Sequence, residues 1–488
     1  MTIQLKDPSL LKTQAYINGA WVDGDKGETF AVTNPATGEH IVDVVNVGVE
    51  ETRRAIEAAE AAMKSWKAKP AKERSAVLRR WYDLIMANVE DLAVLMTSEQ
   101  GKVLLESRGE VAYGASFIEW FAEEGKRVYG DIIPAPQTDR RAVVVKQPVG
   151  VVAAVTPWNF PSAMITRKAG PALAVGCAIV LKPAAETPLS ALALVELADR
   201  AGLPAGLFSV LPSTQSRDVG LELTTNPIVK KFTFTGSTPV GKILMKQCAD
   251  TVKRTSMELG GNAPVLVFDD ADLDLAVAGA IASKYRNSGQ TCVCANRILV
   301  QEGVYDAFVE KFTATVKGFK VGNGLEEGVT HGPVITEKAL SDIHGMVTDS
   351  VAAGAKVEVG GEPSDQGSRF YQPTVLTNVN DQMRVFREEI FGPVAPIFKF
   401  KTEEEAIAMA NDTEYGLAAY IYARDVGRVW RVSEGVDFGM VGVNEVGITS
   451  DVIPFGGMKE SGQGREGSKY GLDDYLEIKY ICMGGLDN

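Results

Sequence analysis

Two residues of this sequence, a cysteine and a glutamate among glycines, could together carry out covalent chemistry. Cys292 lies in residues 289–296, and Glu258 lies a short way upstream in residues 257–262. A thiol nucleophile and a carboxylate base can form and then release a covalent intermediate. The chain has only three histidines, none of them near Cys292 in sequence. This argues against a thiol protease, which normally uses a histidine partner, although distant residues can meet in a fold. We expect another group to activate the sulfur.

Composition and charge narrow the class of protein. A chain of 488 residues with 45% hydrophobic and 23% charged residues predicts a soluble protein of two or three domains. Its net charge of -13 repels polyanions and argues against nucleic acid as a partner. Five cysteines are too few for a disulfide framework, which favours a reducing compartment. The longest apolar run, residues 169–181, is too short to span a bilayer. We therefore expect a cytoplasmic protein without a membrane partner.

The elements that must position these residues follow from periodicity. Residues 15–48 alternate apolar and polar with turn signals, which predicts hairpin strands. Two amphipathic helices follow and are separated by Pro70. Short β-rich runs then alternate with helical stretches, which predicts a parallel sheet with helices on its faces. These runs are residues 143–145, 151–155, 178–181, 208–211 and 231–234. Such sheets bind ligands at the carboxyl ends of their strands.

A second α/β pattern runs from about residue 263 to residue 445, with strands expected at 265–268 and 298–301. The tail, residues 473–483, and an arm near residues 129–146 also read as strands, but neither has an obvious partner within either domain. Exposed strands of this kind invite pairing with another subunit. We therefore expect a homo-oligomer, either a dimer or a tetramer.

A glycine-rich turn offers a competing function. Residues 236–242 fit the Gly-x-x-x-x-Gly-Lys core of a phosphate loop, and an apolar strand ending at Asp269 resembles the magnesium-holding strand of nucleotide hydrolases. However, Ile243 follows the lysine where the magnesium-binding hydroxyl should be. We favour an interpretation without nucleotide hydrolysis, in which a helix N-terminus presents backbone N–H groups to an anion such as a dinucleotide pyrophosphate. A purely structural turn is the third alternative.

Seven short motifs together resemble the aldehyde dehydrogenase superfamily in content and order, and they span nearly the whole chain. They are PWNFP at 157–161, LKPA at 181–184, FTGST at 234–238, ELGG at 258–261, GQTC at 289–292, EIFGP at 389–393 and PFGG at 454–457. The resemblance implies an α/β fold with a Rossmann-like cofactor-binding domain, an α/β catalytic domain and a small β oligomerisation arm. The expected boundaries are 1–126 with 147–262, then 263–445, and 127–146 with 470–488 respectively.

The resemblance also implies a mechanism. Cys292 would attack an aldehyde, giving a thiohemiacetal that passes a hydride to the nicotinamide and becomes a thioester. Because a free thiol is only a few per cent ionised at neutral pH, its pKa must be lowered. Asn159 and the Cys292 backbone N–H would stabilise the oxyanion. Glu258 would activate the water that releases a free carboxylic acid. The alternatives are a buried packing role for Cys292 and a turn role for Asn159.

The likeness assigns Lys182 to the adenosine ribose, Gly236 and Ser237 to the pyrophosphate, and Glu389 to the nicotinamide ribose. A surface ion pair is the alternative for the lysine and the glutamate. NAD-preferring members often carry a carboxylate three residues after this lysine, where Ala185 stands here with Glu186 beside it. NADP is therefore favoured and NAD remains possible. The full expected cofactor set is Thr156, Pro157, Trp158, Lys182, Ala185, Gly236, Ser237, Gly241, Glu389 and Phe391.

Within the superfamily the chain resembles succinate-semialdehyde dehydrogenases, then glutarate-semialdehyde dehydrogenases, through residues 165–168, 285–287 and 292–296. A substrate with a distal carboxylate needs a local cation, and arginine matches it. The likeness assigns this clamp to Arg167 and Arg286, with Ser450 and Phe455 nearby; structural salt bridges are the alternative for both arginines. The loop 444–450 departs from many bacterial members. Competing functions are oxidation of another aldehyde, such as a betaine-type one, or a thiol esterase or acyltransferase.

Cys294 lies two residues beyond the nucleophile. A lone Cys-x-Cys argues against zinc, and no metal site is expected. In an extended segment such residues lie about 6.6 Å apart on one face, within the range that disulfides accept. This predicts a reversible oxidative switch in which Cys294 traps Cys292; simple packing beside the site is the alternative.

Overall fold

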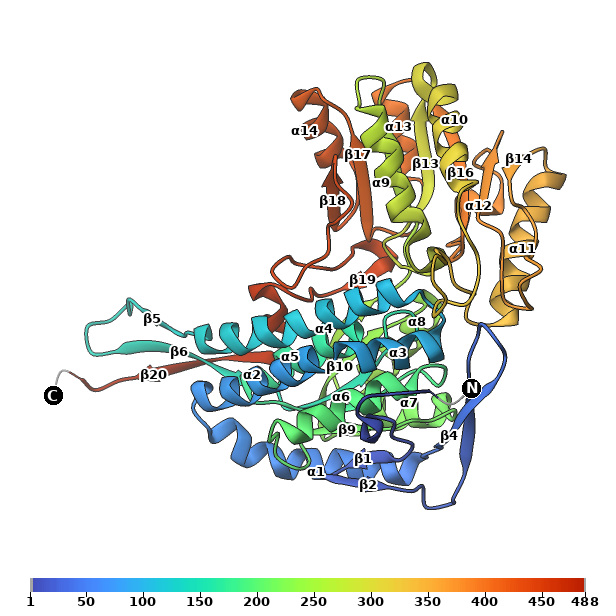
Figure 1. Ribbon diagram of the computed structural model, residues 1–488. Coiled ribbons are helices and arrows are strands. Elements are labelled where there is room, and N and C mark those ends of the chain that lie inside the picture. Colours follow the sequence, from blue (N-terminus) through green and yellow to red (C-terminus); the bar gives the residue numbers. More distant parts are fainter. Residues whose placement is uncertain (1–2, 487–488) are drawn as a thin grey trace.

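The computed structural model describes residues 3–486, and it places two α/β units one above the other with an arm projecting to one side (Figure 1). Within those residues the lower unit contains a sheet in the order β19-β11-β10-β7-β8-β9-β1-β2. The strands from β11 to β9 run parallel, and β19, β1 and β2 are antiparallel to their neighbours. Their bounds are β1 (Ala15–Ile17), β2 (Ala20–Val22), β7 (Val151–Val155), β8 (Ala178–Lys182), β9 (Phe208–Val210), β10 (Val229–Thr235), β11 (Arg254–Glu258) and β19 (Gly462–Gln463).

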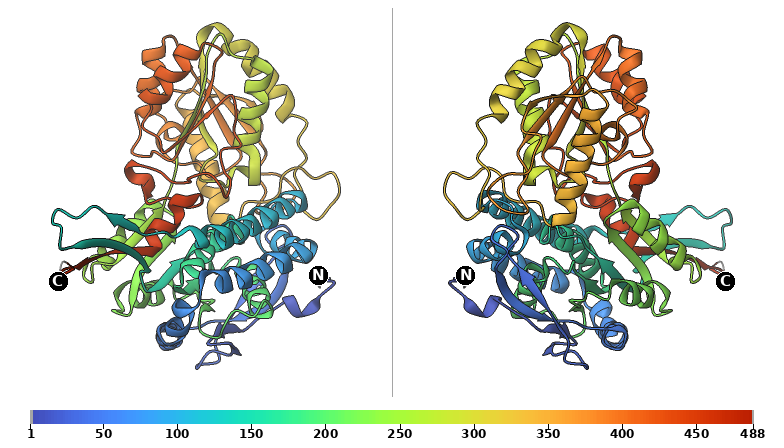
Figure 2. Two further views of the ribbon diagram at one scale, coloured as in Figure 1. Left: turned by 90° about the vertical axis from the view of Figure 1, so that its left-hand side faces the viewer. Right: turned by 90° about the vertical axis from the view of Figure 1, so that its right-hand side faces the viewer.

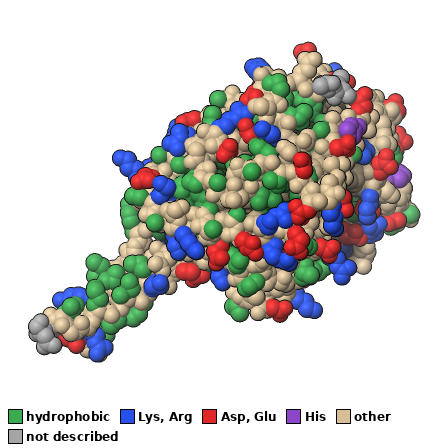
Figure 3. Space-filling model, turned by 90° about the horizontal axis from the view of Figure 1, so that it is seen from below, with side chains coloured by type: hydrophobic (Ala, Val, Ile, Leu, Met, Phe, Trp, Pro, Cys, Tyr) green, Lys and Arg blue, Asp and Glu red, His purple; other side chains and the backbone are tan. Residues whose placement is uncertain are grey.

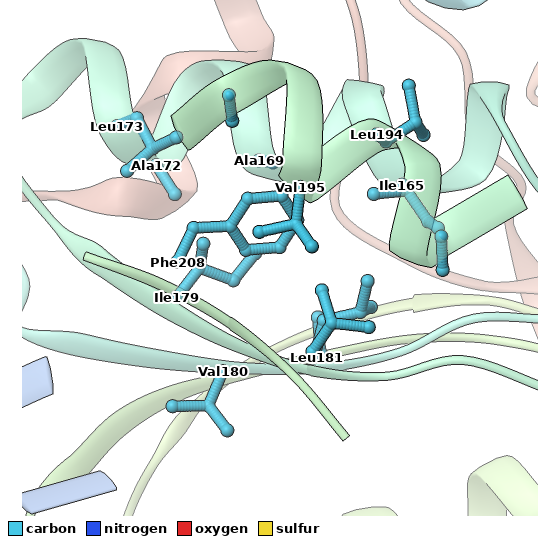
Figure 4. Packing of buried hydrophobic residues seen from close by; sticks show 14 of the residues in the cluster. Ile165, Ala169, Ala172, Leu173, Ile179, Val180, Leu181, Leu194, Val195 and Phe208 are labelled. Atoms are coloured by element: carbon cyan, nitrogen blue, oxygen red, sulfur yellow. The ribbon is translucent and has the colours of Figure 1, made fainter. Parts of the chain in front are cut away.

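Helices cover this sheet because its central strands are apolar on both faces. Every residue of β8 is buried, as expected of a parallel strand between two helical layers. On one face, α5 and α6 bring Ile165, Leu173 and Leu194 against Ile179 and Phe208 (Figure 4). The helices of this unit are α1 (Val49–Ala68), α2 (Ala71–Ala87), α3 (Val89–Gln100), α4 (Leu104–Glu124), α5 (Ala163–Val175), α6 (Pro188–Arg200), α7 (Ser216–Thr225) and α8 (Thr238–Ala249).

The upper unit contains a second, mostly parallel sheet in the order β14-β15-β16-β13-β12-β17-β18, with helices on both sides (Figure 2). Its strands are β12 (Ala263–Val267), β13 (Ala295–Gln301), β14 (Lys356–Val359), β15 (Thr374–Thr377), β16 (Val394–Phe400), β17 (Ala418–Tyr422) and β18 (Met440–Val443). Its helices are α9 (Leu273–Tyr285), α10 (Tyr305–Val316), α11 (Glu337–Ala352), α12 (Arg384–Arg387), α13 (Glu403–Asn411) and α14 (Val426–Gly435). The α/β fold class expected from the sequence is confirmed.

The arm is a small sheet of β5 (Asp131–Ile133), β6 (Arg141–Pro148) and β20 (Leu476–Met483), paired antiparallel. Two expectations are corrected here: residues 143–145 form part of β6 and do not belong to the parallel sheet, and residues 473–475 belong to the 3-10 helix η6 (Lys469–Tyr475) and not to the tail strand. The tail and the arm, for which no partner was expected within either domain, pair with each other, since Tyr480 pairs with Val144 across β20 and β6.

The arm carries exposed apolar side chains and stands clear of the body (Figure 3). They include Tyr129, Ile132, Ile478 and Tyr480, each more than 60% exposed. Such a surface is the kind that another chain covers. The N-terminal hairpins are confirmed by the β1–β2 pair and by β3 (Thr29–Thr33) with β4 (His40–Val45). Among residues 3–486, no helix has the length and apolar character needed to cross a membrane.

The predicted catalytic residues lie at strand ends where the two sheets meet. The carboxyl ends of β7, β8, β10 and β11 lie at one edge of the lower sheet, at Val155, Lys182, Thr235 and Glu258. In the upper unit the corresponding residues precede the strands, because Cys292 comes just before β13. The site therefore lies between the carboxyl edge of one sheet and the amino ends of strands in the other.

Candidate active site

The thiol of Cys292 opens into a cavity of about 240 Å³ formed by residues of both units. Cys292 occupies a turn between η3 (Arg286–Gly289) and β13, and it is partly exposed. Of the predicted catalytic and cofactor residues, those that line this cavity are Pro157, Trp158, Asn159, Gly236, Ser237, Glu258, Cys292, Glu389 and Phe391. Residues far apart in sequence are thus brought together. Met164, Thr235, Leu259 and Gly260 also line it.

Burial dominates the electrostatics of Cys292. Desolvation raises the pKa of its thiol to about 12, the nearby Glu389 carboxylate adds to this, and the Arg167 guanidinium opposes it. A thiol with such a pKa is protonated at neutral pH. A positive charge brought close to the sulfur would lower the pKa. Without such a positive charge, Cys292 is therefore held as the protonated, less reactive thiol.

Glu258, at the end of β11, is the carboxylate of the cavity. It is 3% exposed, and neither of its carboxylate oxygens has a hydrogen-bond partner among the described residues. Burial raises its pKa well above the ordinary value, and Glu466 raises it further, while Lys168 and Arg167 oppose the shift. A buried carboxylate with raised pKa and free oxygens is suited to accept a proton near neutral pH.

Asn159 follows β7 and is fixed by hydrogen bonds on both its side chain and its backbone. Its Nδ2 donates to the carbonyl of Gln290 at 3.0 Å. Its own carbonyl accepts from Lys102 Nζ at 2.7 Å and from Asn287 Nδ2 at 3.1 Å. The Asn159 side chain is 6% exposed and faces the cavity of Cys292. An amide held in this way can present its second hydrogen to a developing negative charge.

The turn after β10 and the start of α8 fit an anionic group. Gly236 lies directly after β10, where a Cβ would collide with the ring of Phe234. Ser237 is the N-cap of α8 and makes no side-chain capping bond, so the first N–H groups of the helix lack a capping partner from that side chain. A Cβ on Gly241 would collide with Leu259, so this glycine permits close packing of the helix. The donors here match a pyrophosphate.

Lys182 ends β8, is 4% exposed, and donates to the carbonyl of Pro183 at 3.2 Å. Burial lowers its pKa to about 8, with Glu186 opposing. The remaining N–H donors of this amine suit ribose hydroxyl groups. Thr156 Oγ1 is also buried without a partner among the described residues. The structure does not bring Ala185 into the Cys292 cavity; it lines a second cavity of about 240 Å³ together with Glu186.

Glu389 and Phe391 close the cavity from the upper unit. Glu389 Oε1 accepts from the Gly261 N–H at 2.9 Å. Burial raises its pKa to about 7, while this hydrogen bond and Lys284 oppose the shift. The Phe391 ring meets Trp158 edge to face, with centroids 5.6 Å apart. The Glu389 carboxylate, these two aromatic rings and the N–H groups at the start of α8 together fit a dinucleotide cofactor.

The two predicted substrate arginines have different surroundings. Arg167, on α5, is 1% exposed, lies 3.5 Å from Glu466 and 4.4 Å from the centre of the Phe455 ring, and donates to the Tyr113 hydroxyl. Its ion pair matches the structural alternative, yet its Nε has no partner among the described residues. Both arginines lower the pKa of the buried Tyr113, which burial raises, so they lie on the same side of the site.

Arg286 is half-buried, with its guanidinium 4.9 Å from the centre of the Phe160 ring. Across residues 3–486, this guanidinium makes no ion pair or hydrogen bond. Ser450 donates to Asp451 at 2.9 Å, whereas the adjacent Thr449 side chain lowers the pKa of Tyr113. Neither arginine, nor Ser450 or Phe455, lines the Cys292 cavity itself.

Sequence reasoning missed Tyr113, Thr449 and two buried ion pairs, Lys102–Glu110 and Lys168–Glu466. No local signal in the sequence marks these pairs, because Lys102 follows the polar residues 97–100 and Lys168 follows Arg167, as exposed lysines often do. The carboxylate that each contacts could not be identified from sequence.

The geometric premise for Cys294 is wrong. Residues 292–294 do not form an extended segment; they form a turn in which the Cys294 N–H donates to the Thr291 carbonyl at 3.0 Å. The Cys294 thiol is buried and lies 3.6 Å from Lys284 Nζ. The oxidative switch stays a prediction, but it loses the argument from strand spacing.

Comparisons with known proteins agree with this geometry. The chain matches the aldehyde dehydrogenase family over residues 21–481. It is 61% identical over 484 residues to a glutarate-semialdehyde dehydrogenase of Pseudomonas aeruginosa, covering 99% of this chain and 100% of the relative. It is 58% identical over 482 residues to an NADP(+) succinate-semialdehyde dehydrogenase of Escherichia coli, covering 99% and 100%. A crystal structure of succinate-semialdehyde dehydrogenase from Burkholderia pseudomallei matches with a TM-score of 0.98 at 59% identity, covering 99% and 100%. The chain therefore belongs to the aldehyde dehydrogenase family.

Proposed function

We propose that this protein oxidises an aldehyde with a distal carboxylate to the dicarboxylic acid, with NAD(P) as the hydride acceptor. Succinate semialdehyde is the favoured substrate and glutarate semialdehyde the alternative, since relatives named for each are about equally similar to the chain. The observation that carries the proposal is Arg286, a half-buried cation in a protein of net charge -13 that has no carboxylate partner within 4.0 Å among the described residues; the buried Glu106 interacts with it only at longer range. A substrate carboxylate would supply that partner.

The residues of the cavity divide the chemistry between them. The Cys292 thiolate adds to the aldehyde carbon, while the Asn159 amide and the Cys292 backbone N–H stabilise the negative oxygen. Arg286 and Arg167 hold the distal carboxylate, with Ser450 and the Phe455 ring beside them. The bound nicotinamide supplies the acceptor for the hydride. The chemistry of each side chain supports its proposed role.

Release of the product falls to Glu258. Its free, buried oxygens can take a proton from the water that attacks the thioester, which yields a carboxylic acid and restores the thiol. A chain that passed its acyl group to coenzyme A or phosphate would not need such a base. The proposed reaction is therefore a non-acylating oxidation.

We propose that NADP is the preferred cofactor and that NAD is also accepted. Lys182 would hold the adenosine ribose, the turn at Gly236 and Ser237 the pyrophosphate, and Glu389 the nicotinamide ribose. Ala185 supports NADP, because a methyl group there neither bonds a 2′-hydroxyl nor repels a 2′-phosphate. The name of the Escherichia coli relative specifies NADP(+).

The oligomerisation arm supports a homo-oligomer. Its exposed apolar side chains and the free edges of its small sheet are features that a second copy of the chain would cover. We propose a dimer or a tetramer, and sedimentation of the purified protein would distinguish them.

The function is tested by following cofactor absorbance at equal concentrations of NAD and NADP across a panel of aldehydes. We expect reduction with succinate and glutarate semialdehydes to exceed that with butanal and betaine aldehyde, and to vanish in Cys292→Ala. Absence of cofactor reduction with every aldehyde, together with release of p-nitrophenol from an ester, would favour a thiol esterase instead.

A further inference from the structure

Behind the cysteine, a single asparagine contacts both loops that form the oxyanion site. Asn287 lies in η3 and is 2% exposed. Its Nδ2 donates to the carbonyl of Asn159 at 3.1 Å and to the carbonyl of Gln290 at 3.2 Å. Asn159 belongs to the loop after β7, and Gln290 stands two residues before Cys292. One side-chain amide therefore joins the loop of the oxyanion donor to the loop of the nucleophile.

The Gln290 carbonyl is shared between the two asparagines. It accepts from Asn159 Nδ2 at 3.0 Å as well as from Asn287. Since an amide nitrogen carries two hydrogens, the bond to Gln290 fixes the direction of the second Asn159 hydrogen. That second hydrogen is the one available to an oxygen at the Cys292 cavity. Asn287 thus contacts both the Asn159 backbone and the group that orients its amide.

The remaining polar groups of Asn287 are all bonded. Its N–H donates to Glu106 Oε1 at 2.9 Å, and its Oδ1 accepts from Gln100 Nε2 at 3.2 Å. Its carbonyl accepts from the Gln290 N–H at 3.0 Å and from Gln290 Nε2 at 3.1 Å. A buried network whose members are all satisfied is rigid. This side chain is therefore held in one place.

The backbone here is strained. Asn287 has φ 51° and the next residue, Ser288, has φ 54°, both in the left-handed region. Asparagine enters this region more readily than most residues, and serine does so at a cost. Such conformations persist where the surrounding structure imposes them, often at functional sites. This turn directs the Asn287 N–H to α4 and its side chain to the loop after β7.

We propose that Asn287 is a positioning residue that holds the Asn159 amide at a fixed distance from the Cys292 thiol. The inference rests on the proposed function, in which Asn159 stabilises the oxygen that becomes negative. In that step the sulfur–carbon bond forms and the carbonyl π pair moves to oxygen. Because an oxyanion donor acts only at hydrogen-bonding distance, a small displacement of Asn159 slows addition. The reactivity of the thiol itself does not depend on it.

Two reactions of Cys292 separate these effects. Acylation by p-nitrophenyl acetate passes through an oxyanion before p-nitrophenolate leaves, whereas alkylation by iodoacetamide displaces iodide and forms no oxyanion. Asn287→Gly suits the left-handed backbone and removes both donors; Asn287→Asp keeps the shape but cannot donate when ionised. We expect acylation to fall about 10- to 100-fold, less than the loss of a whole oxyanion donor. Alkylation should stay within about twofold, because it needs no oxyanion donor.

The matched control is Ser288→Gly. This residue shares the strained turn, and its hydroxyl donates to the Gly332 carbonyl at 2.9 Å, away from Asn159. Both rates should be unchanged in this variant, and the melting temperatures of all variants report on folding. An equal fall of both rates in the Asn287 variants, or no fall in acylation, would overturn the inference.

Asn159→Ala keeps the two hypotheses apart. If this variant acylates normally, the assignment of Asn159 in the proposed function fails, whatever the Asn287 variants do. If Asn159→Ala acylates slowly while both Asn287 variants acylate normally, only the positioning role is lost. If all three acylate slowly and alkylate normally, both hypotheses hold.

Discussion

Polar groups in front of Cys292 and behind it have opposite surroundings. In front, among the described residues, Glu258 has two carboxylate oxygens without partners; at the Phe160 ring, outside the Cys292 cavity, the Arg286 guanidinium has neither an ion pair nor a hydrogen bond. Behind, Lys102 donates to Glu110 and to the Asn159 carbonyl, and every polar group of Asn287 is bonded. An unpaired buried polar group costs about 1 to 3 kcal/mol. The front gives up stability to leave groups free for chemistry, while the back is satisfied and holds them in place.

The comparison is tested most strongly by Glu258→Gln. Glutamine keeps the shape of the side chain but cannot accept a proton from water, so turnover should fall about 10²- to 10⁴-fold. The first turnover should survive, because acyl formation uses Cys292 and Asn159. Stopped-flow absorbance of the reduced cofactor would then show a burst followed by a slow phase.

The control for this variant is Cys292→Ala, which should show neither the burst nor turnover. Loss of the burst in Glu258→Gln would instead place the carboxylate in the first half of the reaction. A raised pKa also predicts that turnover falls as the pH is lowered through the pKa of Glu258, since the protonated acid cannot act as a base. Glu258→Gln should lack this dependence.

The region behind the cysteine is tested by Lys102→Met. Methionine fills a similar volume but leaves the buried Glu110 without its cation, which should lower the free energy of unfolding by about 3 to 5 kcal/mol. Chemical denaturation would measure it. Arg108→Met is the control, because the pair between Arg108 of α4 and Glu90 of α3 is exposed and should contribute nothing measurable. Equal losses of unfolding free energy in Lys102→Met and Arg108→Met would contradict the proposed structural importance of the buried pair behind Cys292.

The sequence predicted the front of the site better than the back. Glu258 and Cys292 stand in short glycine-containing motifs, ELGG at 258–261 and GQTC at 289–292, which can be recognised in the sequence itself. By contrast, Lys102 and Asn287 both donate to the Asn159 carbonyl, although they lie 57 and 128 residues from it in the sequence. Contacts of that separation depend on the finished fold and leave no local pattern.

Local conformation set a second limit. Residues 143–145 read correctly as a strand, but their place in the arm depends on pairing with β20 more than 300 residues away. The expected extended segment at Cys294 was wrong because Asn287, Ser288 and Gly289 turn the chain through left-handed conformations just before it. Serine gives no signal for such a conformation.

The free cation at the Phe160 ring is tested by Arg286→Ala. Removing one partner of a buried charge pair costs about 2 to 5 kcal/mol of binding free energy. At the low end of that range, KM for succinate semialdehyde should rise about 30-fold. For butanal, which lacks the carboxylate, KM should be nearly unchanged. Arg286→Lys keeps the charge but loses the bidentate geometry of the guanidinium. Its KM for succinate semialdehyde should lie between the values for the unaltered protein and for Arg286→Ala. An equal change for both aldehydes would remove Arg286 from substrate recognition.

The smallest effect concerns the thiol itself. With a pKa of about 12, Cys292 ionises tenfold more for each pH unit between pH 7 and 9. Because the thiolate is the reactive form, alkylation by iodoacetamide should rise by about tenfold per unit over that range. An ordinary thiol would begin to level off near pH 9. The rate is measured by mass spectrometry in a Cys482→Ser background, since Cys482 is exposed. Bound NADP should raise the rate at pH 7 and flatten the slope, because a cationic ring near the sulfur favours the thiolate. A slope that NADP leaves unchanged would mean that the protein activates Cys292 by another group, and the front of the site would then hold its own counter-charge.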